Sequence, residues 1–176
     1  MLRNKVFLLL LIFFCLRSQA DILALIGENN VFEREAYPTQ YTSRSPLVVR
    51  VGYQEDANAI FGEYNQYSTT DGMSQLEITR TQRELLVWGR HIFWPESLFQ
   101  LYVQGAPGVE LEYVKTDFMG QSSQDTSKPY FALAAAAGGA VQYERFRVEL
   151  EFRALSSGLS SPNPTLSVGF YGGYVF

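Results

Sequence analysis

The chain has 176 residues, with 18 acidic and 14 basic side chains and one cysteine. Residues 1–20 contain three of the basic side chains, none of the acidic ones and that cysteine, so the remainder has 11 basic residues, a formal charge of −7 and no thiol. An acidic chain of this kind disfavours nucleic acid, which selects basic surfaces. Without a thiol, residues 21–176 cannot form disulfides, thiolate metal sites or a cysteine active site, and their length suits one domain.

The first twenty residues have the composition of a secretory signal peptide. Arg3 and Lys5 precede an apolar run, Val6 to Leu16, that is too short to cross a bilayer as a helix. Small residues lie ahead of a cleavage site, so we predict cleavage between Ala20 and Asp21. The alternative is a membrane anchor that stays attached.

Eight segments of the remaining chain have the pattern of strands, with apolar side chains alternating with polar or small ones. In chain order they cover Ile22–Gly27, Leu47–Gln54, Asn58–Tyr67, Ile78–Phe93, Phe99–Lys115, Tyr130–Tyr143, about 146–155 and 164–176. The strand at 146–155 shows the pattern most clearly, because Phe, Val, Leu, Phe and Ala alternate there with Arg147, Glu149, Glu151 and Arg153. Strands of about 9–11 residues suit a tilted crossing of a membrane.

The connections between these segments are of two kinds. Short turns are expected at Glu55–Ala57, Pro95–Ser97 and Glu144–Arg145. On the opposite side we expect a turn at Thr70–Gly72 and polar loops at Asn29–Ser45, Thr116–Lys128 and Ser156–Asn163. An even number of strands puts both ends of the domain on the side of the short turns.

Three features together carry a resemblance to a known group of proteins. The chain ends on Tyr174-Val175-Phe176, a small-residue strand at 136–143 turns tightly into 146–149, and a charged row lies behind the apolar face. In these features the chain resembles the small eight-stranded outer-membrane barrels, the group that includes the transmembrane domain of outer membrane protein A and outer membrane protein X. A soluble periplasmic β-protein is the alternative.

The resemblance implies an all-β fold, a closed antiparallel up-and-down transmembrane barrel in the outer membrane of a Gram-negative bacterium. It also implies contact with outer-membrane lipid and lipopolysaccharide, insertion by the barrel assembly machinery with periplasmic chaperones, and a monomer. Tyr174 and Phe176 would form the assembly signature.

The alternation places a row of charged side chains in the lumen. These are Arg50, Glu84, Arg90, Glu110, Glu112, Arg147, Glu149, Glu151 and Arg153, joined by Glu63. Eight strands leave a space that side chains just fill, so these charges must pair. We expect Arg147 and Arg153 to pair with Glu84, Glu110 and Glu112 across the barrel. A closed plug is favoured over a gated polar path for ions.

Catalysis and metal binding have little support in the sequence. His91 is the single histidine, and no serine lies two positions further along, where barrel lipid-A deacylases would place one. Glu110 and Glu112 share a face but are more simply structural. We therefore expect no catalytic residues, cofactor or metal, and a structural or surface-interaction role in the cell envelope. The alternative is a small channel or transport protein with a narrow lumen for ions or small polar solutes.

Overall fold

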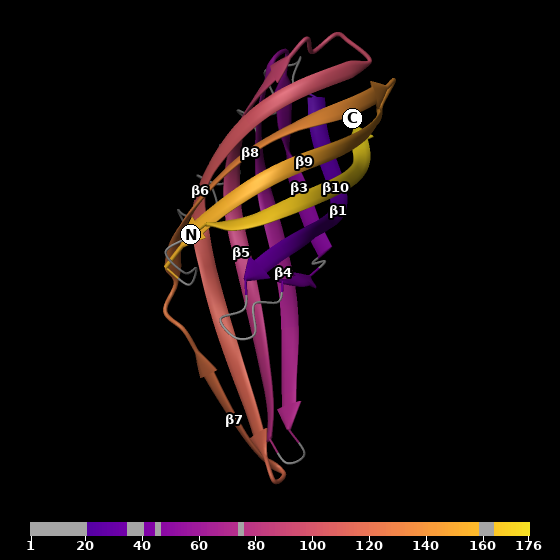
Figure 1. The fold of residues 1–176 in the computed structure, drawn as a ribbon. Coiled ribbons are helices and arrows are strands. Elements are labelled where there is room, and N and C mark those ends of the chain that lie inside the picture. Colours follow the sequence, from indigo (N-terminus) through magenta and orange to yellow (C-terminus); the bar gives the residue numbers. More distant parts are fainter. Residues whose placement is uncertain (1–20, 35–40, 45–46, 74–75, 159–163) are drawn as a thin grey trace, which may run out of the picture.

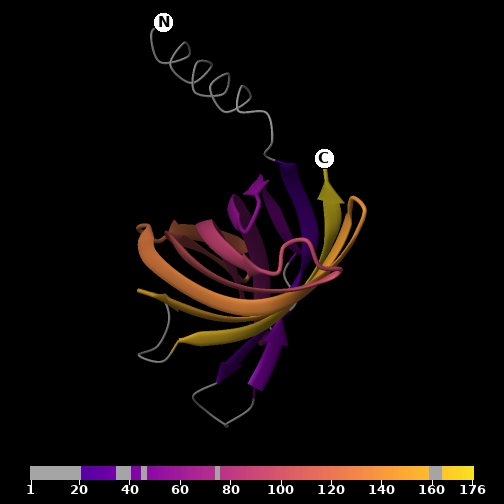
Figure 2. The ribbon, with the colours of Figure 1, turned by 90° about the horizontal axis from the view of Figure 1, so that it is seen from above.

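The computed structural model describes residues 21–34, 41–44, 47–73, 76–158 and 164–176. Within these ranges eight long strands form a closed antiparallel barrel, as predicted (Figures 1 and 2). They are β1 (Asp21–Arg34), β3 (Leu47–Glu55), β4 (Asn58–Met73), β5 (Leu76–Phe93), β6 (Phe99–Phe118), β8 (Tyr130–Tyr143), β9 (Phe146–Ser157) and β10 (Thr165–Val175). The predicted signal peptide, including Ala20, lies outside the described residues, and Asp21 is the first residue of β1.

The barrel closes between its first and last strands. β1 and β10 pair antiparallel in a register that runs from Leu23 opposite Val175 to Phe32 opposite Leu166. At the rim, the backbone N–H of Phe176 donates a hydrogen bond to the carbonyl of Ile22 over 2.8 Å. Closure satisfies the backbone groups that an open sheet edge would leave unpaired in lipid.

Three tight turns share the rim at which the C-terminus lies. Asp56, Trp94 and Glu144 occupy these turns with φ angles of 50°, 54° and 52°. A left-handed residue at such a position lets the chain reverse within a few residues. Short turns at the C-terminal rim mark this end as the periplasmic one.

Several strands are longer than the sequence predicted. β1 runs to Arg34 instead of ending at Gly27, and the predicted turn at Thr70–Gly72 lies inside β4. The predicted loop Thr116–Lys128 instead contains the end of β6 and a short strand, β7 (Gln121–Thr126), which pairs with β6. Another short strand, β2 (Tyr41–Arg44), pairs with β1 inside the predicted loop Asn29–Ser45. These extensions are held by backbone pairing, which needs no apolar alternation, so hydrophobic periodicity did not reveal them.

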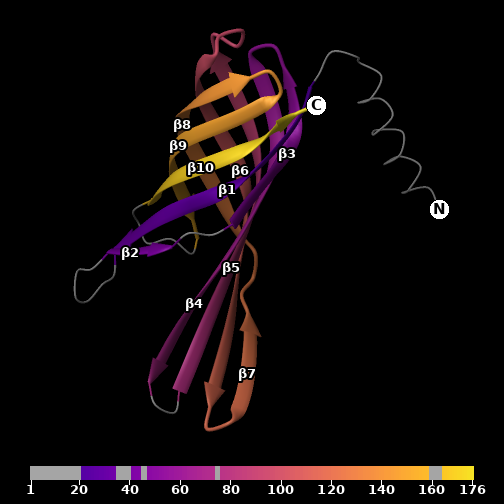
Figure 3. The ribbon, with the colours of Figure 1, turned by 90° about the vertical axis from the view of Figure 1, so that its right-hand side faces the viewer.

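β4, β5 and β6 continue well beyond the barrel wall. They contain 16, 18 and 20 residues, whereas about 9–11 suffice to cross a membrane. At about 3.3 Å per residue, the surplus carries the sheet roughly 20–25 Å further. Figure 3 shows β4, β5 and β7 projecting away from the barrel at the end opposite the C-terminus. We call residues 67–73 of β4, 76–82 of β5 and 112–118 of β6, together with β7, the projecting sheet.

The barrel is apolar outside and charged inside. Leu101 on β6, Phe152 on β9 and Phe170 on β10 point outward with 54%, 63% and 60% of their surface exposed, while charged residues line the interior. Among the described residues no helix is long and apolar enough to cross a membrane. A water-soluble protein would bury such an apolar face, so this polarity suits a surrounding of lipid.

Candidate functional site

The lumen holds a network of eight charged residues that we call the lumen ion network. Each has at most 4% of its surface exposed. The members are Arg50, Arg90, Arg147, Arg153, Glu63, Glu84, Glu149 and Glu151. They come from β3, β4, β5 and β9, and each occupies an inward position in the alternation of its strand.

Arg50 on β3 lies at the centre of this network. Its Nε donates to Glu63 on β4 over 2.7 Å, and its two Nη atoms donate to both carboxylate oxygens of Glu151 on β9 over 2.9 and 2.7 Å. It also donates to the Tyr171 hydroxyl over 3.0 Å and lies 3.7 Å from the centre of that ring. A planar guanidinium can make two parallel bonds to a carboxylate, so Arg50 joins strands on opposite walls.

Glu149 joins two further arginines toward the periplasmic rim. Arg90 donates to its two oxygens over 2.5 and 2.8 Å, and the Nε of Arg147 donates to it over 2.6 Å. Arg147 also donates to Gln100 over 2.8 Å. The strong Arg147 pairing is therefore with its own strand, two residues along, and not with the predicted partners on β5 and β6. The stagger of the strands sets these heights, and the sequence does not specify it.

Arg153 closes the network on the other side. It donates to Glu63 over 2.6 Å and to Glu84 over 2.7 Å, and Glu84 is one of the partners expected from the sequence. Glu110 is buried and accepts a hydrogen bond from the Ser157 hydroxyl. Glu112 is only half-buried, because β6 leaves the barrel wall at that height, and its backbone N–H donates to the Ser127 hydroxyl over 2.9 Å.

Aromatic rings and amides complete the lumen, and the sequence analysis did not single most of them out. Trp88 stacks on Phe61 with ring centres 6.4 Å apart and donates its indole N–H to Glu63 over 3.0 Å. The Arg90 guanidinium lies 3.9 Å from the centre of the Tyr102 ring. Trp88 and Tyr102 lie an even number of residues from inward charged residues on their own strands. The same alternation that predicted the inward charges could therefore have predicted that these two rings face the lumen.

This arrangement pairs the buried charges of the lumen. Every member of the lumen ion network has an ion-pair partner within hydrogen-bonding distance. Charges this deeply buried are tolerated when they are paired and hydrogen-bonded, and an eight-stranded barrel has little space beyond its own side chains. Chemically, the network ties strands together by ion pairs.

The projecting sheet has one polar face with its own contacts. On the outer side, the Ser68 and Thr81 hydroxyls lie 2.7 Å apart, and Lys115 forms an ion pair with Asp117 over 2.7 Å. The hydrogen bond from Lys115 lowers the pKa of Asp117 below its usual value. The same hydrogen bond raises the pKa of Lys115.

The other face of the projecting sheet is apolar toward its tip. Leu76 on β5 lies opposite Phe118 on β6 in the pairing register, and their exposed fractions are 36% and 49%. Met119 in the adjoining turn is 67% exposed. Exposed apolar side chains grouped at the end of a projecting element are a feature of contact surfaces.

The remaining predicted residues lie on the barrel exterior. Phe176 is 61% exposed at the periplasmic rim, and its ring packs edge-on against Tyr174, which packs against Phe146 at centre distances of 4.8 and 5.4 Å. His91 points outward and its Nδ1 lies 3.1 Å from the Asn58 Oδ1. Over the described ranges no group of three or more His, Cys, Asp or Glu side chains is placed to hold a metal ion.

Comparison with known proteins gives matches at the level of structure. No protein-family model and no curated protein matches the sequence. Ail, the attachment invasion locus protein of Yersinia pestis, solved in complex with the heparin analogue sucrose octasulfate, superposes with a TM-score of 0.63 at 14% identity, over 90% of this chain and 100% of Ail. Neisserial surface protein A gives 0.61 at 12% identity, over 90% and 96%. The N-terminal β-barrel domain of OprF from Pseudomonas aeruginosa gives 0.57 at 10% identity, over 88% and 97%.

The chain has the fold of a small eight-stranded outer-membrane barrel. This fold and the apolar exterior agree, and together they place the protein in the outer membrane of a Gram-negative bacterium. At identities of 10–14% the likeness extends to the fold alone, so the role of this barrel has to be argued from its own residues.

Proposed function

We propose that this protein is a surface-interaction protein of the cell envelope, in which a closed barrel acts as a rigid anchor for the projecting sheet. The observation that carries the proposal is the combination of a filled lumen with strands of 16–20 residues on one side only. Surplus strand length costs ordering entropy and contributes nothing to crossing the membrane. A sheet that extends about 20–25 Å beyond the barrel wall is well placed for contact with a partner.

The proposal includes the assembly and state of the barrel. The terminal aromatic Phe176 would be the feature that the barrel assembly machinery recognises, after periplasmic chaperones have carried the chain across the periplasm. Residues 1–20 would be removed as a signal peptide between Ala20 and Asp21. The protein would act as a monomer, without enzymatic activity, in contact with outer-membrane lipid and lipopolysaccharide.

The test uses cells that display the protein. Leu76→Ser combined with Phe118→Ser removes the paired apolar side chains at the tip of the projecting sheet, and Gln124→Ser, an exposed position of β7 opposite Lys115 in the pairing register, is the control on the other face. Adhesion of the cells to protein-coated and polysaccharide-coated surfaces is measured, with surface amounts equalised. We expect the tip variant to lose adhesion and the control to keep it. Equal adhesion of both variants would contradict the contact role.

A channel is the competing function, and conductance distinguishes the two. Purified barrel inserted into planar bilayers should carry no steady current if, as we propose, the buried lumen ion network closes its cross-section. A steady ionic current from the parent protein would support transport instead. Adhesion tests the contact role and conductance tests the transport role, and each measurement can give either result whatever the other shows.

A further inference from the structure

A polar pair interrupts the lipid-facing surface close to the periplasmic rim. His91 on β5 and Asn58 on β4 lie opposite each other in the pairing register, and both point outward. His91 lies two residues before Phe93 and three before Trp94, which is 66% exposed in the turn. At about 3.3 Å per residue, the imidazole is within roughly 10 Å of the rim, at the depth of lipid headgroups and glycerol. An ionisable side chain facing lipid calls for a partner.

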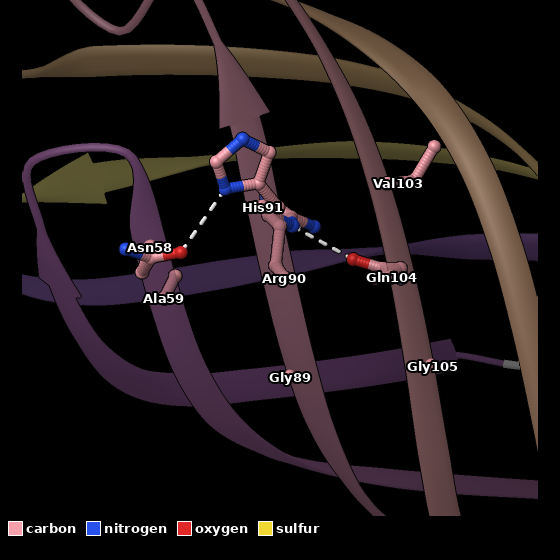
Figure 4. Close-up of a pocket in the computed structure, with 8 residues that line it drawn as sticks. All are labelled: Asn58, Ala59, Gly89, Arg90, His91, Val103, Gln104 and Gly105. Atoms are coloured by element: carbon pink, nitrogen blue, oxygen red, sulfur yellow. Dashed lines mark hydrogen bonds between the residues drawn. The ribbon is translucent and has the colours of Figure 1, made fainter.

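A hollow lies beside this pair on the same outer surface. Its floor includes Gly89 and Gly105, which face each other across β5 and β6, and Val103 forms part of its wall (Figure 4). A Cβ built on Gly89 meets no atom within 4 Å. The hollow is therefore an open depression in the wall that an apolar chain can occupy, with a polar group at its periplasmic end.

The hydrogen bond between His91 and Asn58 fixes what the polar end offers. Because the Asn58 Oδ1 can only accept, the Nδ1 of His91 donates to it, with the amide oxygen assigned as in the structure. In the tautomer that carries its proton on Nδ1, the Nε2 atom is an acceptor, and the amide nitrogen of Asn58 is a donor. His91 also packs edge-on against Phe93 with ring centres 5.1 Å apart, which orients the ring. The acceptor can receive a hydrogen bond from an ammonium group, and the donor beside it can give one to a phosphate oxygen, so the pair matches a ligand that carries both groups.

We infer that this hollow binds one glycerophospholipid with an ethanolamine headgroup from the periplasmic leaflet. The lipid ammonium donates to Nε2 of His91, a phosphate oxygen accepts from the Asn58 amide, and one acyl chain lies over Gly89 and Gly105. Complementary hydrogen bonding at the headgroup distinguishes this lipid from others in the same leaflet. The inference concerns the membrane side of the barrel and is independent of the projecting sheet.

The test exploits the fact that His91 is the single histidine of the chain. Protein labelled with ¹⁵N-histidine, purified without a histidine tag and refolded in a non-ionic detergent, gives imidazole signals from one residue. Phosphatidylethanolamine is titrated in and compared with phosphatidylglycerol, diacylglycerol and free phosphoethanolamine. We expect a saturable shift of the imidazole signals at about one phosphatidylethanolamine per barrel, at least about tenfold tighter than for the other three.

Substitution of the glycine supplies the structural control. Gly89→Val puts an apolar side chain into the hollow, at a position of β5 where a Cβ meets no atom within 4 Å. The control, Gly172→Val, puts the same side chain at an outward position of β10, where a Cβ also meets no atom within 4 Å. Gly89→Val should weaken binding about tenfold, and Gly172→Val should leave it unchanged.

Two results would overturn the inference. One is equal binding by the two valine variants, which would show that the hollow is not the site. The other is binding of diacylglycerol, phosphatidylglycerol or free phosphoethanolamine as tight as that of phosphatidylethanolamine, which would remove the headgroup or the acyl chain from recognition. Heat-modifiable migration on a gel checks that each variant is a folded barrel, so a loss of binding is not mistaken for a loss of fold.

Discussion

Replacing Arg153 by methionine tests whether the lumen is dry and closed. Arg153 is 4% exposed and donates to Glu63 over 2.6 Å and to Glu84 over 2.7 Å. Methionine keeps much of the side-chain volume and removes the charge. After the substitution Glu63 retains its hydrogen bond from Arg50, whereas Glu84 retains, within the part of the chain that the structure describes, the hydrogen bond from the Asn65 side-chain amide over 3.2 Å. The damage is therefore concentrated on one buried carboxylate.

The magnitude follows from that burial. Breaking a buried ion pair by removing one partner costs about 3–5 kcal/mol, because the other charge is left uncompensated. In a water-filled lumen the cost would fall to the roughly 0–1 kcal/mol of an exposed pair. With a denaturant slope of about 1–3 kcal/mol per molar urea, the dry lumen predicts that the unfolding midpoint falls by about 2 M.

The assay is urea unfolding of barrel refolded into lipid vesicles, followed by tryptophan fluorescence. Arg83→Met is the matched control, because Arg83 is exposed on the outer face, where it donates to Gln66 over 3.0 Å. The double variant Arg153→Met with Glu84→Gln removes the stranded charge and should recover about 1–3 kcal/mol of the loss. If Arg153→Met shifted the midpoint no more than Arg83→Met, the closed, dry lumen would be refuted.

Three further predictions concern the ends of the chain and the projecting sheet. N-terminal sequencing of protein from an outer-membrane fraction should begin at Asp21, and a start at Met1 would contradict cleavage after Ala20. Deleting Phe176 should sharply reduce the heat-modifiable population in cells, and normal insertion of the shortened chain would remove the support for an assembly signature. Hydrogen bonds from Lys115, on the same strand, and from Ser122, on β7, lower the pKa of Asp117. The charged carboxylate therefore stabilises the β6–β7 hairpin above the ordinary pKa of aspartate, about 3.9, and this contribution disappears as the pH falls through the lowered value. Hydrogen exchange of the hairpin amides should therefore rise, relative to the intrinsic rate, below about pH 4 in the parent but not in Asp117→Asn, and a change of the same size in both would rule the pair out as the cause.

The sequence alone predicted the strand count, the closed barrel and which side chains face inward across the membrane. These properties depend on an alternation of period two that lipid enforces on one face of each strand, so the pattern remains legible along β9 and β10. Outside the membrane that constraint disappears. Water accepts polar side chains on both faces of a strand, which is why residues 70–72 and 121–126 indicated a turn and a loop yet belong to β4 and β7.

Only the tertiary structure decided which charges meet. Alternation gives the face of a residue but not its height, and the height depends on how far each strand is staggered against its neighbours. The stagger brings Arg50 to Glu151, which lies 101 residues away in the sequence, and brings Arg147 to Glu149 on its own strand. It also sets His91 beside Asn58 and next to the depression at Gly89 and Gly105, a juxtaposition of three strands that no single segment of the sequence contains.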